Sequence, residues 1–232
     1  IWQRLQNESV LRLSWFGDDA AARPALVRAM QRADTATLLA EAEPVLQRLR
    51  KDFGISHWYF IGTDRRILLR VHEPSKSGDV VQRKTLLDAV ATGKPATGIE
   101  LGSTATYTLR HVIPWRVDGR LIGYIELGQE VEWFASQIKH LTHLETITAV
   151  TKRFTNEENF LFGKKALGFS GNWQDHHGFA ILSQTLPELP EHLITTWENT
   201  SADQQSGVFE ARSQDVRWSG IFIPLPDYEQ RP

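Results

Sequence analysis

The chain has 232 residues, of which 41% are hydrophobic and 23% charged, and its net charge at pH 7 is −2. These values are ordinary for one large or two small folded domains, and they exclude a mainly disordered chain. The balanced charge gives no general attraction to nucleic acid. The absence of cysteine excludes disulfides, thiolate metal sites and cysteine nucleophiles. No stretch of the sequence approaches the ~20 apolar residues needed to cross a bilayer.

The first quarter of the chain is predicted to be helical, over 1–17 and 24–53. Apolar residues recur at helical spacing in the second segment, and Pro24 suits a first helical turn. Pro44 falls inside the pattern and predicts a kink or a break. Gly54 predicts the end of the helix.

The period then changes to that of strands. Residues 56–72 predict two strands joined by a Gly-Thr-Asp turn, and a loop and a helix ending at Gly93 follow. Residues 96–128 predict three further strands with a hairpin at Asp118-Gly119, because Asp-Gly between apolar runs favours a two-residue turn. The predicted fold class is therefore α+β, with helices segregated against an antiparallel sheet.

The second half is predicted to repeat this design less completely. The expected elements are a helix over 129–145, a short strand and basic turn over 146–154, a mixed stretch with several glycines over 156–178, a strand over 178–185, a short helix over 189–199, and strands over 207–213 and 216–227. The stretch HVIPWRVDGR is echoed by FIPLPDYEQR, and the order of elements repeats. We therefore predict two sheet modules, the second without its last strand.

Polar side chains occupy one face of the first predicted sheet, where packing against helices favours apolar residues. Alternation along 67–72 separates two sets of side chains: Leu68, Arg70 and His72 on one face, and Ile67, Leu69 and Val71 on the other. The later strands place three more polar residues on a common face: Arg110, Tyr124 and Glu126. Asp79 and Arg83 follow in the loop and helix that would fold over the sheet.

Two interpretations of these seven polar residues stay open. In the first, they line a cavity between sheet and helix that holds a small polar or anionic ligand, because arginine binds carboxylates through paired hydrogen bonds. In the second, Arg70, Arg110 and Glu126 pair with each other or face the solvent.

Catalysis, a metal and a cofactor have no support in the sequence. No nucleophile-elbow, zinc-protease or phosphate-loop motif is present, so we expect no enzyme activity from this chain and no cofactor. His140 and His143 have the helical spacing of metal ligands, but no third ligand is evident and a solvated helix face explains them better.

Several of these segments resemble one family. They are LLRVH with Gly78-Asp79 and Arg83 after it, GIELG, the strand Thr108-Leu-Arg, and DGRLIGYIELG. Together they resemble the double Cache sensory domains found outside the membrane in bacterial sensor histidine kinases, diguanylate cyclases and chemoreceptors. The resemblance covers most of the chain and is strongest over 55–131.

The resemblance implies two PAS-like modules on a long N-terminal helix. It assigns 1–54 to a helical stalk, 55–130 to a membrane-distal module, and 131–232 to a connecting helix and membrane-proximal module. The parent protein would be anchored in the inner membrane by helices before residue 1 and after residue 232, with this part in the periplasm or outside the cell.

The resemblance also implies a function. Ligands of the family usually bind the distal module, which favours a ligand site at Arg70, His72, Asp79, Arg83, Arg110, Tyr124 and Glu126. Ligand binding would shift a population of states and displace the helices, which are also a plausible homodimer surface. The amino-acid-binding signature of some family members is not clearly present. The alternative is a spacer or protein-interaction module with an exposed apolar patch around Trp133 and Phe134.

Overall fold

The chain divides into two compact units. In this computed structural model the described residues are 1–102, 105–187, 189, 194–195, 208–213, 216–225 and 228. The first unit comprises Ile1–Glu100 and Thr108–Trp133, and the second comprises Leu101–Tyr107 and Phe134–Pro232. The module boundaries proposed from the sequence, at residues 54 and 130, stay a prediction. None of the helices within the described part of the chain is long and apolar enough to cross a membrane.

Three helices open the first unit: α1 (Trp2–Ala22), α2 (Pro24–Gln31) and α3 (Thr35–Phe53). Of the kink or break predicted at Pro44, the break is wrong, because α3 runs through this residue and the chain breaks at 32–34 instead; the kink stays a prediction. Asp34 caps the new helix by accepting the Thr37 N–H at 3.1 Å. Pro44 is tolerated because Ala40, whose carbonyl loses its helical partner, is exposed to solvent.

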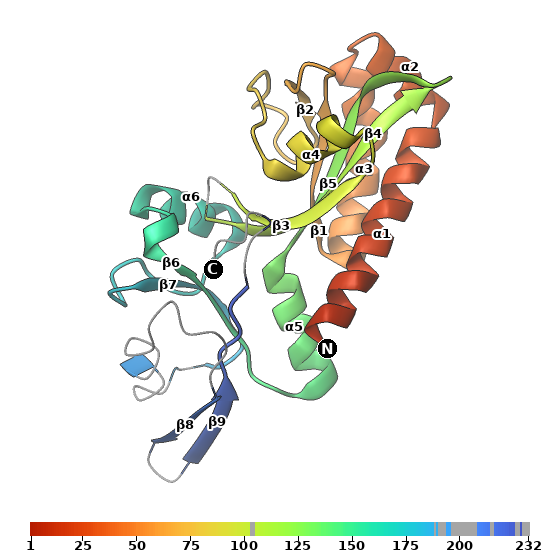
Figure 1. Cartoon of the computed structure of the whole chain (residues 1–232). Helices are drawn as coiled ribbons and strands as arrows, with labels where there is room; N and C mark the ends of the chain where they lie inside the picture. Colours follow the sequence, from red (N-terminus) through yellow and green to blue (C-terminus); the bar gives the residue numbers. More distant parts are fainter. Residues whose placement is uncertain are drawn as a thin grey trace. The chain divides into compact units, whose positions relative to one another are not determined.

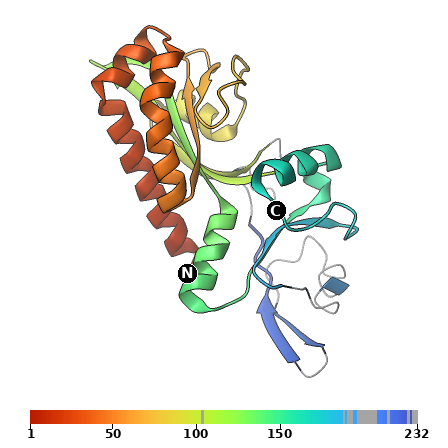
Figure 2. The same cartoon turned by 180° about the vertical axis from the view of Figure 1, so that it is seen from behind.

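A five-stranded sheet follows, in the order β2-β1-β5-β4-β3 (Figures 1 and 2). Its elements are β1 (Ile55–Ile61), β2 (Ile67–Arg70), α4 (Lys84–Thr92), β3 (Ala96–Leu101), β4 (Tyr107–Val117) and β5 (Arg120–Glu130). The first three helices cover one face of this sheet, and α4 covers part of the other. The α+β class and the antiparallel sheet predicted from the sequence are confirmed.

Glycines allow the unusual backbone conformation at two points of the long β4–β5 hairpin. The turn is the predicted Asp118-Gly119, and both residues have positive φ, +50° and +77°, as the preferred two-residue hairpin turn requires. Gly123 has φ +152°, and a Cβ there would lie 2.4 Å from the carbonyl oxygen of Ile61. Strands β1 and β5 therefore approach too closely at this point for any side chain.

An apolar cluster fills the space between the sheet and α4. It contains Tyr59, Ile61, Ile67, Val81, Leu86, Ala89, Ala96, Val112 and Tyr124. The presence of Ile67 corrects the face assigned to it from simple alternation. Ile67 is paired with Ile61 whereas Arg70 is paired with Tyr59, and the register shift between these pairs brings Ile67 to the same face as Arg70.

Besides residues 101–102 and 105–107, the described part of the second unit contains most of α5 (Val131–Thr142). It continues with β6 (Ile147–Thr151), the 3-10 helix η1 (Lys152–Phe154), α6 (Glu157–Leu167), β7 (Phe179–Gln184), β8 (Val208–Ser213) and β9 (Val216–Ile221). Strand pairs β6–β7 and β8–β9 are antiparallel. Helix α6 was missed in the stretch predicted as mixed, although Asn156 caps it by accepting the Asn159 N–H. The helix predicted over 189–199 lies mostly outside the described residues, so the repeat of two similar modules stays a prediction.

Candidate functional site

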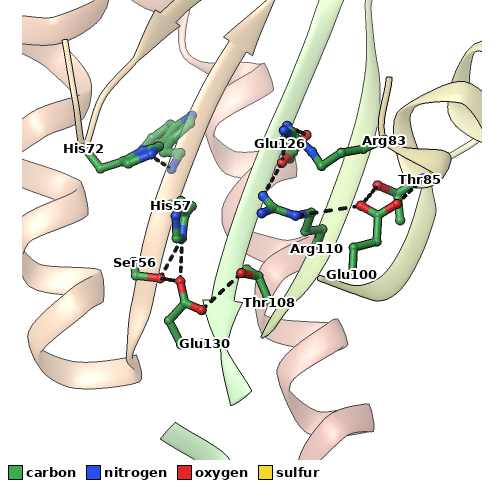
Figure 3. A network of polar contacts seen from close by, with 11 residues as sticks. Ser56, His57, His72, Arg83, Thr85, Glu100, Thr108, Arg110, Glu126 and Glu130 are labelled. Atoms are coloured by element: carbon green, nitrogen blue, oxygen red, sulfur yellow. Dashed lines mark hydrogen bonds and ion pairs between the residues drawn. The ribbon is translucent and has the colours of Figure 1, made fainter. Parts of the chain in front are cut away.

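Polar and charged side chains gather on the α4-side face of the first sheet, beside the apolar cluster (Figure 3). We call this set the polar face: Ser56, His57, Tyr59, Arg70, His72, Arg83, Glu100, Thr108, Arg110, Glu126 and Glu130. Strand register explains the gathering. Glu126 on β5 lies opposite Tyr59 on β1 and Val112 on β4, and Gly128 lies opposite His57 and Arg110. Because Gly128 has no side chain, no β5 residue separates the His57 ring from the Arg110 guanidinium at that level of the sheet.

Glu126 is the centre of the polar face, and it is fully buried. Arg83 Nη2 donates to both of its carboxylate oxygens, at 2.7 and 2.6 Å, and Arg110 Nη1 donates to Oε1 at 2.8 Å. The three residues come from the loop before α4, from β4 and from β5. The sequence predicted all three as site residues, and the structure brings them together.

Opposite charges keep this buried cluster ionised. Burial would raise the pKa of Glu126, but the guanidiniums of Arg83 and Arg110 lower it below its usual value. Burial would also lower the pKa of Arg110, and the nearby carboxylates, Glu126 above all, raise it instead. A buried ion pair gives little net stability because both charges lose their hydration. Such a cluster is therefore a candidate functional site.

Glu100 is the fourth member of this cluster, and the sequence analysis missed it. Its Oε2 lies 3.7 Å from Arg110 Nε. The same carboxylate accepts the backbone N–H of Thr85 at 3.0 Å and the Thr85 hydroxyl at 2.8 Å, in the first turn of α4. Glu100 therefore links the charged cluster to the start of α4, where a negative charge is favourable.

Arg70 and Asp79 bind each other at the edge of the polar face. Arg70 donates from Nη2 to Asp79 at 2.8 Å and from Nη1 to the Lys76 carbonyl at 2.7 Å. Burial would lower the pKa of Arg70, whereas the bond to Asp79 raises it; the same bond lowers the pKa of Asp79. Arg70 thus holds the loop that leads to Arg83, and its direct contact with a ligand stays a prediction.

His72 lies among aromatic rings on the same face. Its Nδ1 accepts the backbone N–H of Trp58 at 3.3 Å, so this nitrogen carries no proton. The ring centroids of His57 and Tyr59 are 4.4 and 4.7 Å from its own. Burial, with positive charge nearby as a smaller contribution, lowers the pKa of His72 to about 2. The imidazole is therefore neutral, with Nε2–H as its donor.

A second carboxylate, Glu130, continues the polar face along β5. It accepts from Ser56 Oγ and Thr108 Oγ1, both at 3.1 Å, and lies 3.0 Å from His57 Nδ1. Burial would raise its pKa, but His57 foremost among its partners lowers it. Sequence reasoning missed this group, although Glu130 shares the alternation of Glu126 and so gave a usable signal.

The two tyrosines of this sheet face have different roles. Tyr124, predicted as a site residue, lies in the apolar cluster, and burial raises its pKa. Tyr59 was not predicted, yet the guanidiniums of Arg83 and Arg70 lie 5.0 and 5.7 Å from its ring centroid. Tyr59 thus positions both arginines through cation–π contacts.

Two arginine nitrogens of the polar face make no hydrogen bond within the described part of the chain. Arg83 Nε and Arg110 Nε are buried, and neither has a hydrogen-bond partner among the described residues. The Nη nitrogens of both guanidiniums bind the same oxygen of Glu126, so the two arginines belong to one cluster. Unpaired buried donors are costly, and a ligand oxygen would remove that cost.

Other candidate features lie elsewhere. A hollow of about 180 Å3 is lined by residues of α3, β2 and the following loop, none of them on the polar face: Thr35, Ala36, Leu39, Leu68, Leu69, Pro74 and Ser77. His140 and His143 are exposed, and within the ranges described no group of three His, Cys, Asp or Glu residues converges to hold a metal. The apolar patch expected around Trp133 and Phe134 is wrong, because Phe134 is fully buried and the Trp133 ring covers Gly54.

Several solved sensory domains are similar to this chain. A domain of a putative sensory box/GGDEF protein from Vibrio parahaemolyticus matches with TM-score 0.51 and 18% identity, over 65% of this chain and 64% of that domain. The Escherichia coli DcuS sensor domain matches with TM-score 0.49 and 16% identity, over 59% of this chain and 98% of the other. The ligand-binding domain of the Campylobacter jejuni chemoreceptor Tlp3, solved with 4-methylisoleucine, matches with TM-score 0.45 and 11% identity, over 93% of this chain and 80% of that domain.

Comparison with protein families places the chain. No curated protein sequence matches it. The family model for the double sensory domain of two-component sensor kinases matches residues 1–213, which is most of the chain. Domains of this family are non-catalytic, extracytoplasmic sensory modules of membrane receptors. The chain therefore belongs to the double Cache family of sensory domains, in agreement with the resemblance carried by its sequence.

Proposed function

We propose that this chain is the extracytoplasmic ligand-sensing part of a bacterial transmembrane receptor, and that it binds a small polar or anionic molecule at the polar face of its first unit. One observation carries the proposal: among the described residues the buried Nε donors of Arg83 and Arg110 make no hydrogen bond, and the Glu100 oxygen beside Arg110 Nε lies 3.7 Å away. Acceptor oxygens of a ligand would satisfy these donors. Within the predicted site, Arg83 is the residue most suited to this contact, because its side chain is 23% exposed and solvent reaches it.

Signalling would use the sheet and the N-terminal helix. Glu126 lies on β5, and α1 packs against the opposite face of β5. A ligand that binds better to one arrangement of Arg83 and Glu126 shifts the population toward that arrangement. The change in β5 would then displace α1 relative to the sheet, and the displacement would be passed across the membrane.

A thermal-shift screen tests the ligand and its place together. The chain is heated with small carboxylates, amines, amino acids and uncharged polar compounds, one at a time. A compound at 100 times its Kd adds about 2.7 kcal/mol of stability and raises Tm visibly. Arg83→Gln should abolish that shift, whereas the control Arg120→Gln, at an exposed position beside the hairpin turn, should keep it.

Each negative result has its own meaning. If no compound raises Tm, ligand sensing by this chain is refuted. If a compound binds with the same affinity to wild type and to Arg83→Gln, the ligand site lies outside the polar face.

A second proposed function is self-association through the N-terminal helices, and a separate observation supports it. Leu11 and Trp15 lie one turn apart on α1, with 71% and 66% of their surface exposed. Large apolar side chains at this spacing form a stripe suited to packing against another helix. We propose that two copies of the chain associate through this stripe.

A further inference from the structure

The polar face carries three guanidiniums, of Arg70, Arg83 and Arg110, and three carboxylates, of Glu100, Glu126 and Glu130, and Asp79 at its edge adds a fourth negative charge. Arg83 and Arg110 face Glu100 and Glu126, and Arg70 is paired with Asp79. His72 is neutral, because its Nδ1 accepts a backbone N–H. The positive charges around the Nε donors of Arg83 and Arg110 are therefore already compensated by carboxylates before any ligand arrives.

Glu126 also occupies the position that an anionic ligand would need. A carboxylate usually binds arginine through two parallel hydrogen bonds. Here Glu126 makes contacts of that length with both guanidiniums, and its carboxylate is fully buried between them (Figure 3). The protein thus supplies its own carboxylate to the arginine pair.

A second carboxylate entering this place would meet two negative charges. Glu126 holds the Nη nitrogens, and Glu100 lies 3.7 Å from the Nε of Arg110. The incoming anion would lose its hydration and gain no uncompensated positive charge. An uncharged oxygen can accept from the free Nε–H groups without that repulsion, and a donor group of the same ligand can bond to the remaining lone pairs of Glu126 or Glu100.

We infer that the polar face takes a ligand of zero net charge, either uncharged or zwitterionic, and rejects simple monoanions because Glu126 already fills the anion position of Arg83 and Arg110. This inference rests on the proposed function and narrows its ligand class. It departs from the anion that two arginines suggest when the sequence is considered alone.

Formate tests the inference, since it is the smallest carboxylate and imitates the end of the Glu126 side chain. Potassium formate is compared with potassium chloride at equal ionic strength, for wild type and for Glu126→Ala. We expect formate to leave the wild-type Tm unchanged and to raise the Tm of Glu126→Ala saturably, by about 3 °C or more. Glu100→Gln is the second variant, which keeps the shape of the side chain. It should bind formate at least tenfold more tightly than wild type and provides the test if Glu126→Ala does not fold.

Two outcomes overturn the inference. If formate stabilises wild type as strongly as the variants, the arginine donors are open to anions. If neither variant gains formate binding, Glu126 and Glu100 are not what excludes an anion. Failure of the proposed function is distinguished by the compound screen: formate rescue with no stabilising compound refutes ligand sensing but leaves the charge argument intact.

Discussion

His72 should make the first unit less stable in mild acid. Its pKa in the folded protein is lowered from 6.5 to about 2, chiefly by burial. In the unfolded chain the His72 ring takes up a proton near its ordinary pKa, whereas in the folded protein the same ring stays neutral. Because the folded pKa is the lower one, the contribution of His72 is fully present above about pH 6.5 and is lost as the pH falls toward 2.

The size of the effect follows from the same two values. Between about pH 7.5 and about pH 5, protonation of the unfolded chain alone lowers the free energy of unfolding by about 2 kcal/mol. The folded pKa hardly enters this figure, because almost no folded protein binds the proton at pH 5. The magnitude therefore depends on one structural fact, the half-buried and neutral position of the ring beside Trp58 and His57.

Urea denaturation at the two pH values measures this difference. His72→Asn is the informative variant, because its Oδ1 can accept the Trp58 N–H in place of Nδ1 while no group titrates. Wild type should lose about 2 kcal/mol more than His72→Asn on going to the lower pH. His140→Asn, at an exposed position on α5, is the matched control and should behave as wild type. Equal pH dependence in wild type and His72→Asn would refute the reasoning.

Three further predictions concern stability and assembly. Gly123→Ala should lower the free energy of unfolding, measured by urea denaturation, by about 3 kcal/mol or more, because backbone strain and a clash with the Ile61 carbonyl add. The control Gly119→Ala, where φ is positive but the space is open, should lower it by about 1 kcal/mol. Equal losses would contradict the close approach of β1 and β5 at Gly123. Glu126→Gln should lower the free energy of unfolding by about 3–5 kcal/mol, because it leaves buried arginine charge without its partner. The control Glu8→Gln, in an exposed helical ion pair, should lower it by less than about 0.5 kcal/mol. A small loss at Glu126 would mean that the cluster is hydrated. Trp15→Ser should leave unfolding unchanged within about 0.5 kcal/mol and abolish association in analytical ultracentrifugation, and an unchanged association constant would exclude the α1 stripe.

Local chemistry explains which elements could be predicted from the sequence. The β4–β5 hairpin was predictable because Asp118-Gly119 determines its own turn. The helix break lies before the N-cap at Asp34 and not at Pro44, because the effect of a proline depends on whether the freed carbonyl faces water. Helix α6 is hard to predict because Gly163 inside it disfavours a helix, and the N-cap residue Asn156 is the local signal in its favour.

The candidate site was predictable only as far as alternation reaches. Alternation along single strands gave Arg110 and Glu126 a common face, and the structure joins them directly. Glu100 could not be assigned in the same way, because its neighbours depend on the order of strands in the sheet and on the position of α4. Arg83 could be predicted as a site residue from its place in the loop. Its contact with Glu126 could not, because that contact depends on how the side chains pack.

The division of the chain into units has a mechanical consequence for the polar face. The chain leaves the first unit after Glu100, re-enters it at Thr108, and leaves again after Trp133. Glu100 and Thr108 are themselves members of the polar face, and Glu130 lies three residues before the last crossing. Tension applied to the backbone of the second unit therefore reaches two carboxylates through covalent bonds, with no intervening non-covalent contact. The candidate site and the second unit are therefore joined by three covalent connections, and each connection begins at or near a residue of the polar face.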